Sequence, residues 1–200
     1  MLIAHRGLYN ENIRENTISA FDNAFKNGYD GIEIDVRLTK DNIPVVIHDS
    51  FISRVSNGQG RIKDYTYKEL LNFNFGITKD EKIPTLEKVI NRYKNKIIII
   101  ELKEKIDIVK YLNNNNKYYI SSFNYDYIKS ITKSINYNLG VINYVFNFFI
   151  DYNKLDFIMI LDALASDTLI KKFKDKNIEV IIYGVVGKIN KYNSNIKYII

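Results

Sequence analysis

The sequence has no cysteine and no tryptophan, and it has only two prolines and nine glycines among 200 residues. The absence of cysteine excludes a disulfide framework, a thiolate nucleophile and a cysteine-based zinc site, so any metal must be held by oxygen or imidazole ligands. The low proline and glycine counts argue against a long disordered linker. With 46% hydrophobic and 26% charged residues, the chain fits one globular domain over residues 1–200.

Long apolar runs are also missing. The isoleucines at 97–100 form a buried-strand run, far below the ~20 residues that a membrane-spanning helix needs. Residues 1–7 contain no basic leader and too short an apolar run for a signal peptide. A cytoplasmic protein with no stable membrane insertion is therefore expected.

The formal net charge of +6 favours an anionic partner. The lysines are spread along the chain rather than gathered into one run. This distribution favours mild steering of a small phosphate-bearing substrate over binding of a nucleic acid, for which no groove-reading helix or stacking motif is evident. The sequence does not reveal the oligomeric state.

Strand-like and helix-like segments alternate along the chain. Thr17 to Asn27 has apolar residues at helical spacing, with Asn16 as the expected N-cap and Gly28 as the expected left-handed C-terminal residue. Further helices are predicted at 85–93, 106–113, 124–134 and 167–176, with short ones near 67–72 and 146–152. Residues 50–83 lack sustained periodicity and are predicted to form an insertion after the second strand.

The strand-like segments predict the fold. There are eight, beginning near Leu2, Ile32, Ile97, Tyr118, Leu139, Phe157, Ile178 and Ile196. Each connection between them is long enough for a crossover helix, which predicts an α/β chain folded as a (β/α)8 TIM barrel that lacks its final outer helix. The span is short for that fold, so an open doubly wound sheet is the competing prediction.

The only two histidines, His5 and His48, each end an apolar strand-like run. In a parallel barrel the carboxyl ends of the strands line the active face, which would place both imidazoles where substrates bind. Two histidines there can act as an acid and base pair near neutral pH. Either histidine alone could instead be structural.

Carboxylates recur at a spacing of two on these strands. Glu33 and Asp35 point to the same face of a strand whose other face is apolar, and Glu101 and Lys103 repeat the spacing. Buried carboxylates repel each other unless a cation lies between them. Glu33, Asp35 and Glu101 are therefore predicted to hold one hard divalent ion, with Lys103 free to bind phosphate. Either pair alone also fits a solvated strand edge.

Five short motifs occur in a distinctive order: His-Arg-Gly at 5–7, Glu-Asn-Thr at 15–17, Glu-x-Asp-Val at 33–36, His-Asp at 48–49 and Glu-Leu-Lys at 101–103. In this combination the chain resembles the glycerophosphodiester phosphodiesterase family. The segment 50–83 is similar to the family's insertion, and Ser-Ser-Phe at 121–123 also matches. The chain departs from the family pattern near its end, where 183–186 read Tyr-Gly-Val-Val and Tyr183 is either an apolar wall of the pocket or a core aromatic.

The resemblance implies a metal-dependent enzyme that hydrolyses glycerophosphodiesters to glycerol 3-phosphate and an alcohol. It implies His5 and His48 as the catalytic acid and base, and Arg6 and Lys103 as contacts to the phosphate. Glu33, Asp35 and Glu101 become the ligands of one divalent cation, Ca²⁺ or Mg²⁺. Two alternatives stay open: a phospholipase of the same barrel type with lipid contacts from 144–149, and a degenerate barrel that binds phosphodiesters without cleaving them.

Overall fold

The barrel is closed. The computed structural model describes residues 1–143, 151–185, 192 and 196–200. Its eight parallel strands are β1 (Leu2–His5), β2 (Gly31–Leu38), β4 (Ile97–Leu102), β5 (Lys117–Ser122), β6 (Tyr137–Asn143), β7 (Phe157–Leu161), β8 (Glu179–Tyr183) and β9 (Lys197–Ile199). Leu2 of β1 lies opposite Tyr198 of β9, and β1 pairs with β2 on its other edge. This pairing confirms the predicted TIM barrel and excludes the open sheet.

Each barrel strand buries both of its faces. Ile34 of β2 points outward into the layer between sheet and helices, whereas Ile99 of β4 points into the barrel interior, and both side chains are fully buried as predicted. Ile3, Tyr119 and Ile181 share the interior cluster with Ile99. The apolar interior cluster fills the barrel, so the site has to lie at one of its ends.

Helix α1 (Ile18–Lys26) lies where the sequence predicts a helix but begins with a different N-cap. The N-cap is Thr17, whose hydroxyl accepts a hydrogen bond from the Ala20 N–H at 3.2 Å. The prediction that Asn16 caps the helix is wrong, because Asn16 adopts φ 55° and its side chain turns to the barrel strands instead. Gly28 follows the helix with φ 80°, as predicted.

The remaining helices are short: α2 (Tyr67–Leu70), α3 (Leu86–Arg92), α4 (Tyr125–Ser130) and α5 (Asp167–Lys174), with 3₁₀ turns η1 (Ile62–Asp64), η2 (Ile108–Tyr111), η3 (Tyr152–Lys154) and η4 (Asp162–Leu164). The predicted helix at 106–113 is wrong, since only η2 forms there. The Asn113 side chain accepts the N–H of Asn115 and turns the chain, which ends helical hydrogen bonding. The helix predicted near 146–152 falls mostly on residues outside the described ranges.

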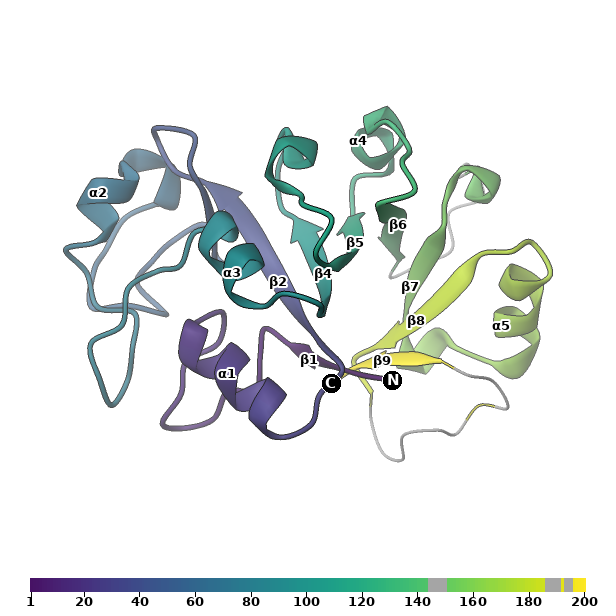
Figure 1. The fold of residues 1–200 in the computed structure, drawn as a ribbon, viewed down its shortest axis with the longest axis horizontal. Coiled ribbons are helices and arrows are strands. Elements are labelled where there is room, and N and C mark those ends of the chain that lie inside the picture. Colours follow the sequence, from purple (N-terminus) through teal and green to yellow (C-terminus); the bar gives the residue numbers. More distant parts are fainter. Residues whose placement is uncertain (144–150, 186–191, 193–195) are drawn as a thin grey trace.

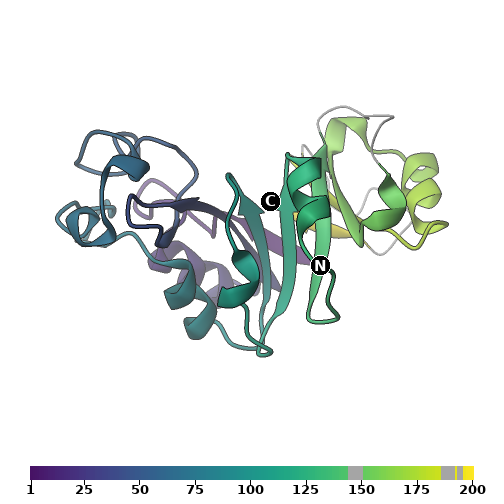
Figure 2. The same ribbon diagram turned by 90° about the horizontal axis from the view of Figure 1, so that it is seen from above.

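The insertion at 50–83 forms a lobe of its own. It packs a separate apolar cluster that includes Ile52, Ile62, Leu70 and Phe75. In Figures 1 and 2 this lobe lies at one end of the molecule, with α5 at the other. The lobe is joined to the barrel by β3 (Pro44–Val46), which runs antiparallel to β2. Within the described residues, no helix has the length and apolar character needed to cross a membrane.

Candidate active site

Charged side chains replace apolar ones at the carboxyl ends of the first barrel strands. Glu33 and Asp35 of β2 point inward because they alternate with outward-facing Ile32, Ile34 and Val36. In the sheet register Glu33 lies opposite His5 of β1, and Asp35 lies opposite Glu101 of β4. The sequence spacing and the parallel register therefore bring these groups to one level of the barrel.

The three predicted metal-ligating carboxylates converge. Glu33, Asp35 and Glu101 are 2%, 0% and 8% exposed, and one oxygen from each lies within 4.8 Å of the others. Burial and the neighbouring charges of Asp35 and Glu101 raise the pKa of Glu33 well above its usual value. A cluster of buried oxygen donors that resists full ionisation fits a hard divalent cation, which would supply the missing positive charge.

Two basic side chains meet this cluster. Lys103 Nζ lies 2.8 Å from Asp35 Oδ1 and also contacts Glu101 Oε1. Arg6 Nε lies 3.2 Å from Asp35 Oδ2. Burial alone would raise the pKa of Asp35, but Lys103 and Arg6 outweigh it and hold that pKa below its usual value. The predicted phosphate contacts thus lie beside the predicted cation ligands.

An unusual backbone conformation places Arg6. Arg6 and Gly7 follow β1 with φ 56° and 80°, both in the left-handed region. A Cβ on Gly7 would lie 2.7 Å from the Ala20 Cβ, so only glycine lets α1 approach this closely. The turned backbone lets the Arg6 N–H donate to Glu33 Oε2 at 3.2 Å.

The two histidines reach the site from different kinds of strand. His5 ends β1, and its Nε2 lies 3.9 Å from Glu33 Oε2. Burial, followed by the charge of Arg6, lowers the pKa of His5 to about 4, so His5 is neutral near pH 7. The apolar run before His48 suggested a parallel barrel strand, but His48 does not end such a strand. It follows β3, which folds back along β2 and returns the chain to the level of Asp35, whose carbonyl accepts the Ile47 N–H at 2.9 Å.

A cavity of about 150 Å³ joins these groups. Its polar side is formed by residues that the sequence singled out, namely His5, Arg6, Glu33, His48, Glu101 and Lys103. The other residues that line it are apolar or aromatic, namely Phe123, Ile142, Met159, Tyr183 and Ile199. Tyr183 therefore lies at the cavity wall, where its hydroxyl donates to the carbonyl of Asn143 at 3.2 Å.

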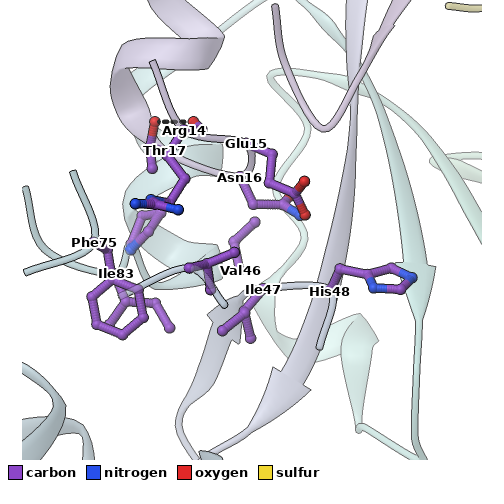
Figure 3. A pocket seen from close by; sticks show the side chains of 11 residues that line it. Arg14, Glu15, Asn16, Thr17, Val46, Ile47, His48, Phe75 and Ile83 are labelled. Atoms are coloured by element: carbon purple, nitrogen blue, oxygen red, sulfur yellow. Dashed lines mark hydrogen bonds between the residues drawn. The ribbon is translucent and has the colours of Figure 1, made fainter. Parts of the chain in front are cut away.

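Several residues near the cavity contribute contacts to the site that the sequence did not predict. Asn16 donates to Asp35 Oδ2 at 2.9 Å, and Glu15 accepts from Arg6 Nη1 at 3.0 Å. The Glu-Asn-Thr motif was the available signal for these two residues. In Figure 3 the side chains of Glu15 and Asn16 extend toward the side on which the imidazole of His48 lies, beside a small neighbouring pocket. Ile142 and Met159 carry no comparable signal, since an inward apolar residue on a strand usually belongs to the core.

Several solved structures share this fold. A glycerophosphodiester phosphodiesterase from Thermotoga maritima is 28% identical and superimposes with a TM-score of 0.75 over 93% of this chain and 86% of its own. A phosphodiesterase from Oleispira antarctica, solved in complex with the product sn-glycerol-3-phosphate, is 24% identical, with a TM-score of 0.81 over 93% of this chain and 85% of its own.

Sequence relatives agree with this likeness. A glycerophosphodiester phosphodiesterase from Caldanaerobacter subterraneus subsp. tengcongensis is 38% identical over 66% of this chain, and one from Bacillus altitudinis is 42% identical over 52%. The matches span 62% and 46% of those relatives' own lengths. A model of the Glycerophosphoryl diester phosphodiesterase family matches residues 5–108, just over half of the chain. The chain belongs to the glycerophosphoryl diester phosphodiesterase family.

Proposed function

We propose that the protein hydrolyses glycerophosphodiesters to glycerol 3-phosphate and an alcohol, with one divalent cation, Ca²⁺ or Mg²⁺. The observation that carries this proposal is the convergence of three buried carboxylates within 4.8 Å, beside a cavity that also contains both histidines of the chain. The product in the Oleispira antarctica structure supports the substrate class, because that protein shares this fold. The substrate class is further supported by the Caldanaerobacter glycerophosphodiester phosphodiesterase, a longer relative that is 38% identical over 66% of this chain.

The charged residues divide between cation and phosphate. Glu33, Asp35 and Glu101 would hold the cation, which when bound would stabilise negative charge on the reacting phosphodiester. Arg6 and Lys103 would contact the phosphate oxygens, where two fixed positive groups favour the more highly charged transition state. The apolar wall formed by Phe123 and Tyr183 would pack against the carbon skeleton of the substrate.

The two histidines would move the protons. His5 is neutral near pH 7, so it can accept a proton from the attacking oxygen, whether that oxygen belongs to water or to a glycerol hydroxyl. His48 Nδ1 lies 2.7 Å from Asp49 Oδ1, so the carboxylate can accept from Nδ1–H and leave Nε2 to exchange a proton with the substrate. His48 would then give a proton to the departing alkoxide.

The test is release of glycerol 3-phosphate from glycerophosphocholine, glycerophosphoethanolamine and glycerophosphoglycerol. We expect release with Mg²⁺ or Ca²⁺, loss of release with EDTA, and recovery when the cation is added in excess. Release that persists unchanged in EDTA would contradict the role of the cation. Binding of these diesters without any turnover would show a degenerate barrel, and turnover of lysophosphatidylcholine alone would show a phospholipase.

A further inference from the structure

Arg54, in the insertion, clamps two acidic residues with one guanidinium group. Its Nε lies 2.5 Å from Asp49 Oδ2 and its Nη2 lies 3.1 Å from Asp49 Oδ1. On its other edge, Nη2 and Nη1 lie 2.7 and 3.1 Å from Glu15 Oε1 and Oε2. Both contacts are two-pronged, which is the arrangement that best fixes the orientation of a carboxylate.

The clamped Asp49 carboxylate is the group that contacts the catalytic candidate His48. Asp49 Oδ1 accepts from Arg54 and lies 2.7 Å from His48 Nδ1. Hydrogen bonds from Arg54, helped by His48, lower the pKa of Asp49 to about 2, so the carboxylate stays ionised across the physiological range. An ionised Asp49 in this orientation keeps a proton on His48 Nδ1 in both the neutral and the protonated imidazole, so Nε2 is the nitrogen that gains or loses the catalytic proton.

The other edge of Arg54 is anchored to the phosphate side of the site. Glu15 Oε1, which accepts from Arg54, also accepts from Arg6 Nη1 at 3.0 Å. Glu15 belongs to the turn before α1, and in Figure 3 its side chain extends toward the side on which His48 lies. A continuous chain of ion pairs therefore runs from His48 through Asp49, Arg54 and Glu15 to Arg6.

We infer that Arg54 is a positioning residue for catalysis: by holding Asp49 it keeps the proton on His48 Nδ1, so that Nε2, directed to the substrate, is the nitrogen that gives the catalytic proton. This inference rests on the proposed function for its catalytic consequence. Its structural part, the tautomer of His48, stands independently. A supporting carboxylate that fixes a histidine tautomer is a recurrent requirement of acid and base catalysis, and here the arginine fixes the carboxylate in turn.

The competing explanation is an ordinary surface ion pair, and the chain contains a matched example. Arg92 contacts Asp22 in the same two-pronged way, with Nε and Nη2 3.1 and 2.7 Å from the two carboxylate oxygens. The side chains of Arg54 and Arg92 are each 50% exposed. Arg92 lies on α3, away from the cavity, so Arg92→Ala reports what loss of such a pair does by itself.

The experiment compares Arg54→Ala, Arg54→Lys and Arg92→Ala with the unsubstituted protein in Mg²⁺. We expect Arg54→Ala to lower kcat ~10- to 100-fold, the usual loss on removing a hydrogen-bonded supporting partner, with little change in KM. Arg54→Lys should recover only part of kcat. The positive charge remains, but a lysine ammonium cannot bind both oxygens of a carboxylate as the planar guanidinium does. Added guanidinium ion at millimolar concentration should partly restore Arg54→Ala. Arg92→Ala should match the unsubstituted protein.

The tautomer is read directly from imidazole ¹⁵N chemical shifts, and only two histidines contribute signals. Arg54→Ala should shift His48 from the Nδ1-protonated form toward the Nε2-protonated form, whereas Arg92→Ala should not. An unchanged His48 tautomer in Arg54→Ala would overturn the inference, and so would an equal loss of kcat in Arg92→Ala. If Arg54→Ala fails to fold, a smaller tautomer shift in the same direction is required of Arg54→Lys. A protein that cleaves no glycerophosphodiester would overturn the proposed function, while the ¹⁵N spectra would still test whether Arg54 determines the tautomer of His48.

Discussion

Lys103 places its ammonium group against Asp35, with Nζ 2.8 Å from Oδ1, and thereby stands beside two of the three carboxylates proposed to hold the cation. The positive charge of Lys103 opposes that of the cation, although it favours an anionic phosphate. Lys103 and the proposed cation would therefore interact with the same carboxylates, and Lys103 should weaken cation affinity in the absence of substrate.

Replacing Lys103 with methionine tests this relationship. Two unit charges a few Å apart interact by on the order of a few kcal/mol at an effective dielectric constant of ~20, so we expect Mg²⁺ or Ca²⁺ affinity to rise roughly tenfold or more. Turnover should fall, because the phosphate loses a contact. Isothermal titration calorimetry without substrate measures the affinity, and exposed Lys105→Met is the control. Lower cation affinity in Lys103→Met would contradict this prediction.

Glu33→Gln should weaken cation binding and turnover together. The substitution keeps the shape of the side chain but removes one of the three carboxylates that would share the charge of the cation. Exposed Glu87 in α3 provides the control substitution, Glu87→Gln, which should leave both quantities unchanged. Loss of turnover at full cation occupancy would instead assign Glu33 a role other than cation binding.

His5→Ala and His48→Ala should each lower turnover by ~10²- to 10⁴-fold, the usual loss for a proton-transfer group. Cation affinity should change little in either variant, because no imidazole belongs to the carboxylate cluster. Steady-state kinetics with glycerophosphocholine, and calorimetry for the cation, separate the two effects. Near-normal release of glycerol 3-phosphate by either variant would mean that its histidine is structural.

Strand periodicity predicted much of this architecture. The strand at 97–102 begins where its apolar run predicts, and the two-residue spacing of Glu33 and Asp35 correctly places both on the inward face. These features depend only on local alternation and parallel register, which a sequence carries directly. The left-handed Gly28 after α1 was also predictable from local sequence, because glycine commonly follows the end of a helix.

The sequence could not predict features that depend on side-chain partners distant along the chain. Asn16 has the residue type of an N-cap, but its amide binds Asp35, 19 positions away, and Thr17 caps α1 instead. The contact between Arg54 and Glu15 spans 39 positions and depends on how the insertion folds onto the barrel. Neither arrangement follows from the spacing of residue types.

Glu33 should make the stability of the cation-free protein fall as the pH rises above 4.5, the ordinary pKa of its carboxyl group. The pKa of Glu33 is raised well above 4.5 in the folded protein, so above that pH this side chain binds more protons in the folded state than in the unfolded state. His5, whose pKa is lowered from 6.5 to about 4, acts in the opposite direction between those values, so the Glu33 contribution is read from a comparison with Glu33→Gln. Unfolding is then increasingly favoured as protons are withdrawn. Urea unfolding in EDTA at pH 5 and pH 8, compared between the unsubstituted protein and Glu33→Gln, isolates the Glu33 contribution, and saturating Mg²⁺ should remove that contribution. Equal slopes with and without Mg²⁺ would contradict the linkage.

Ile99→Ala should destabilise the barrel by about 2 to 5 kcal/mol, the range for removing a buried isoleucine down to Cβ. Ile99 is fully buried and packs inside the barrel with Ile3, Tyr119 and Ile181, below the charged layer of the site. The control is Ile135→Ala, since the Ile135 side chain is fully exposed and should contribute almost nothing. Urea unfolding in Mg²⁺ gives both free energies. If Ile99→Ala lowers the free energy of unfolding as little as Ile135→Ala does, the barrel interior is not packed as described. The carboxylate cluster would then lack the packed apolar layer that supports its geometry.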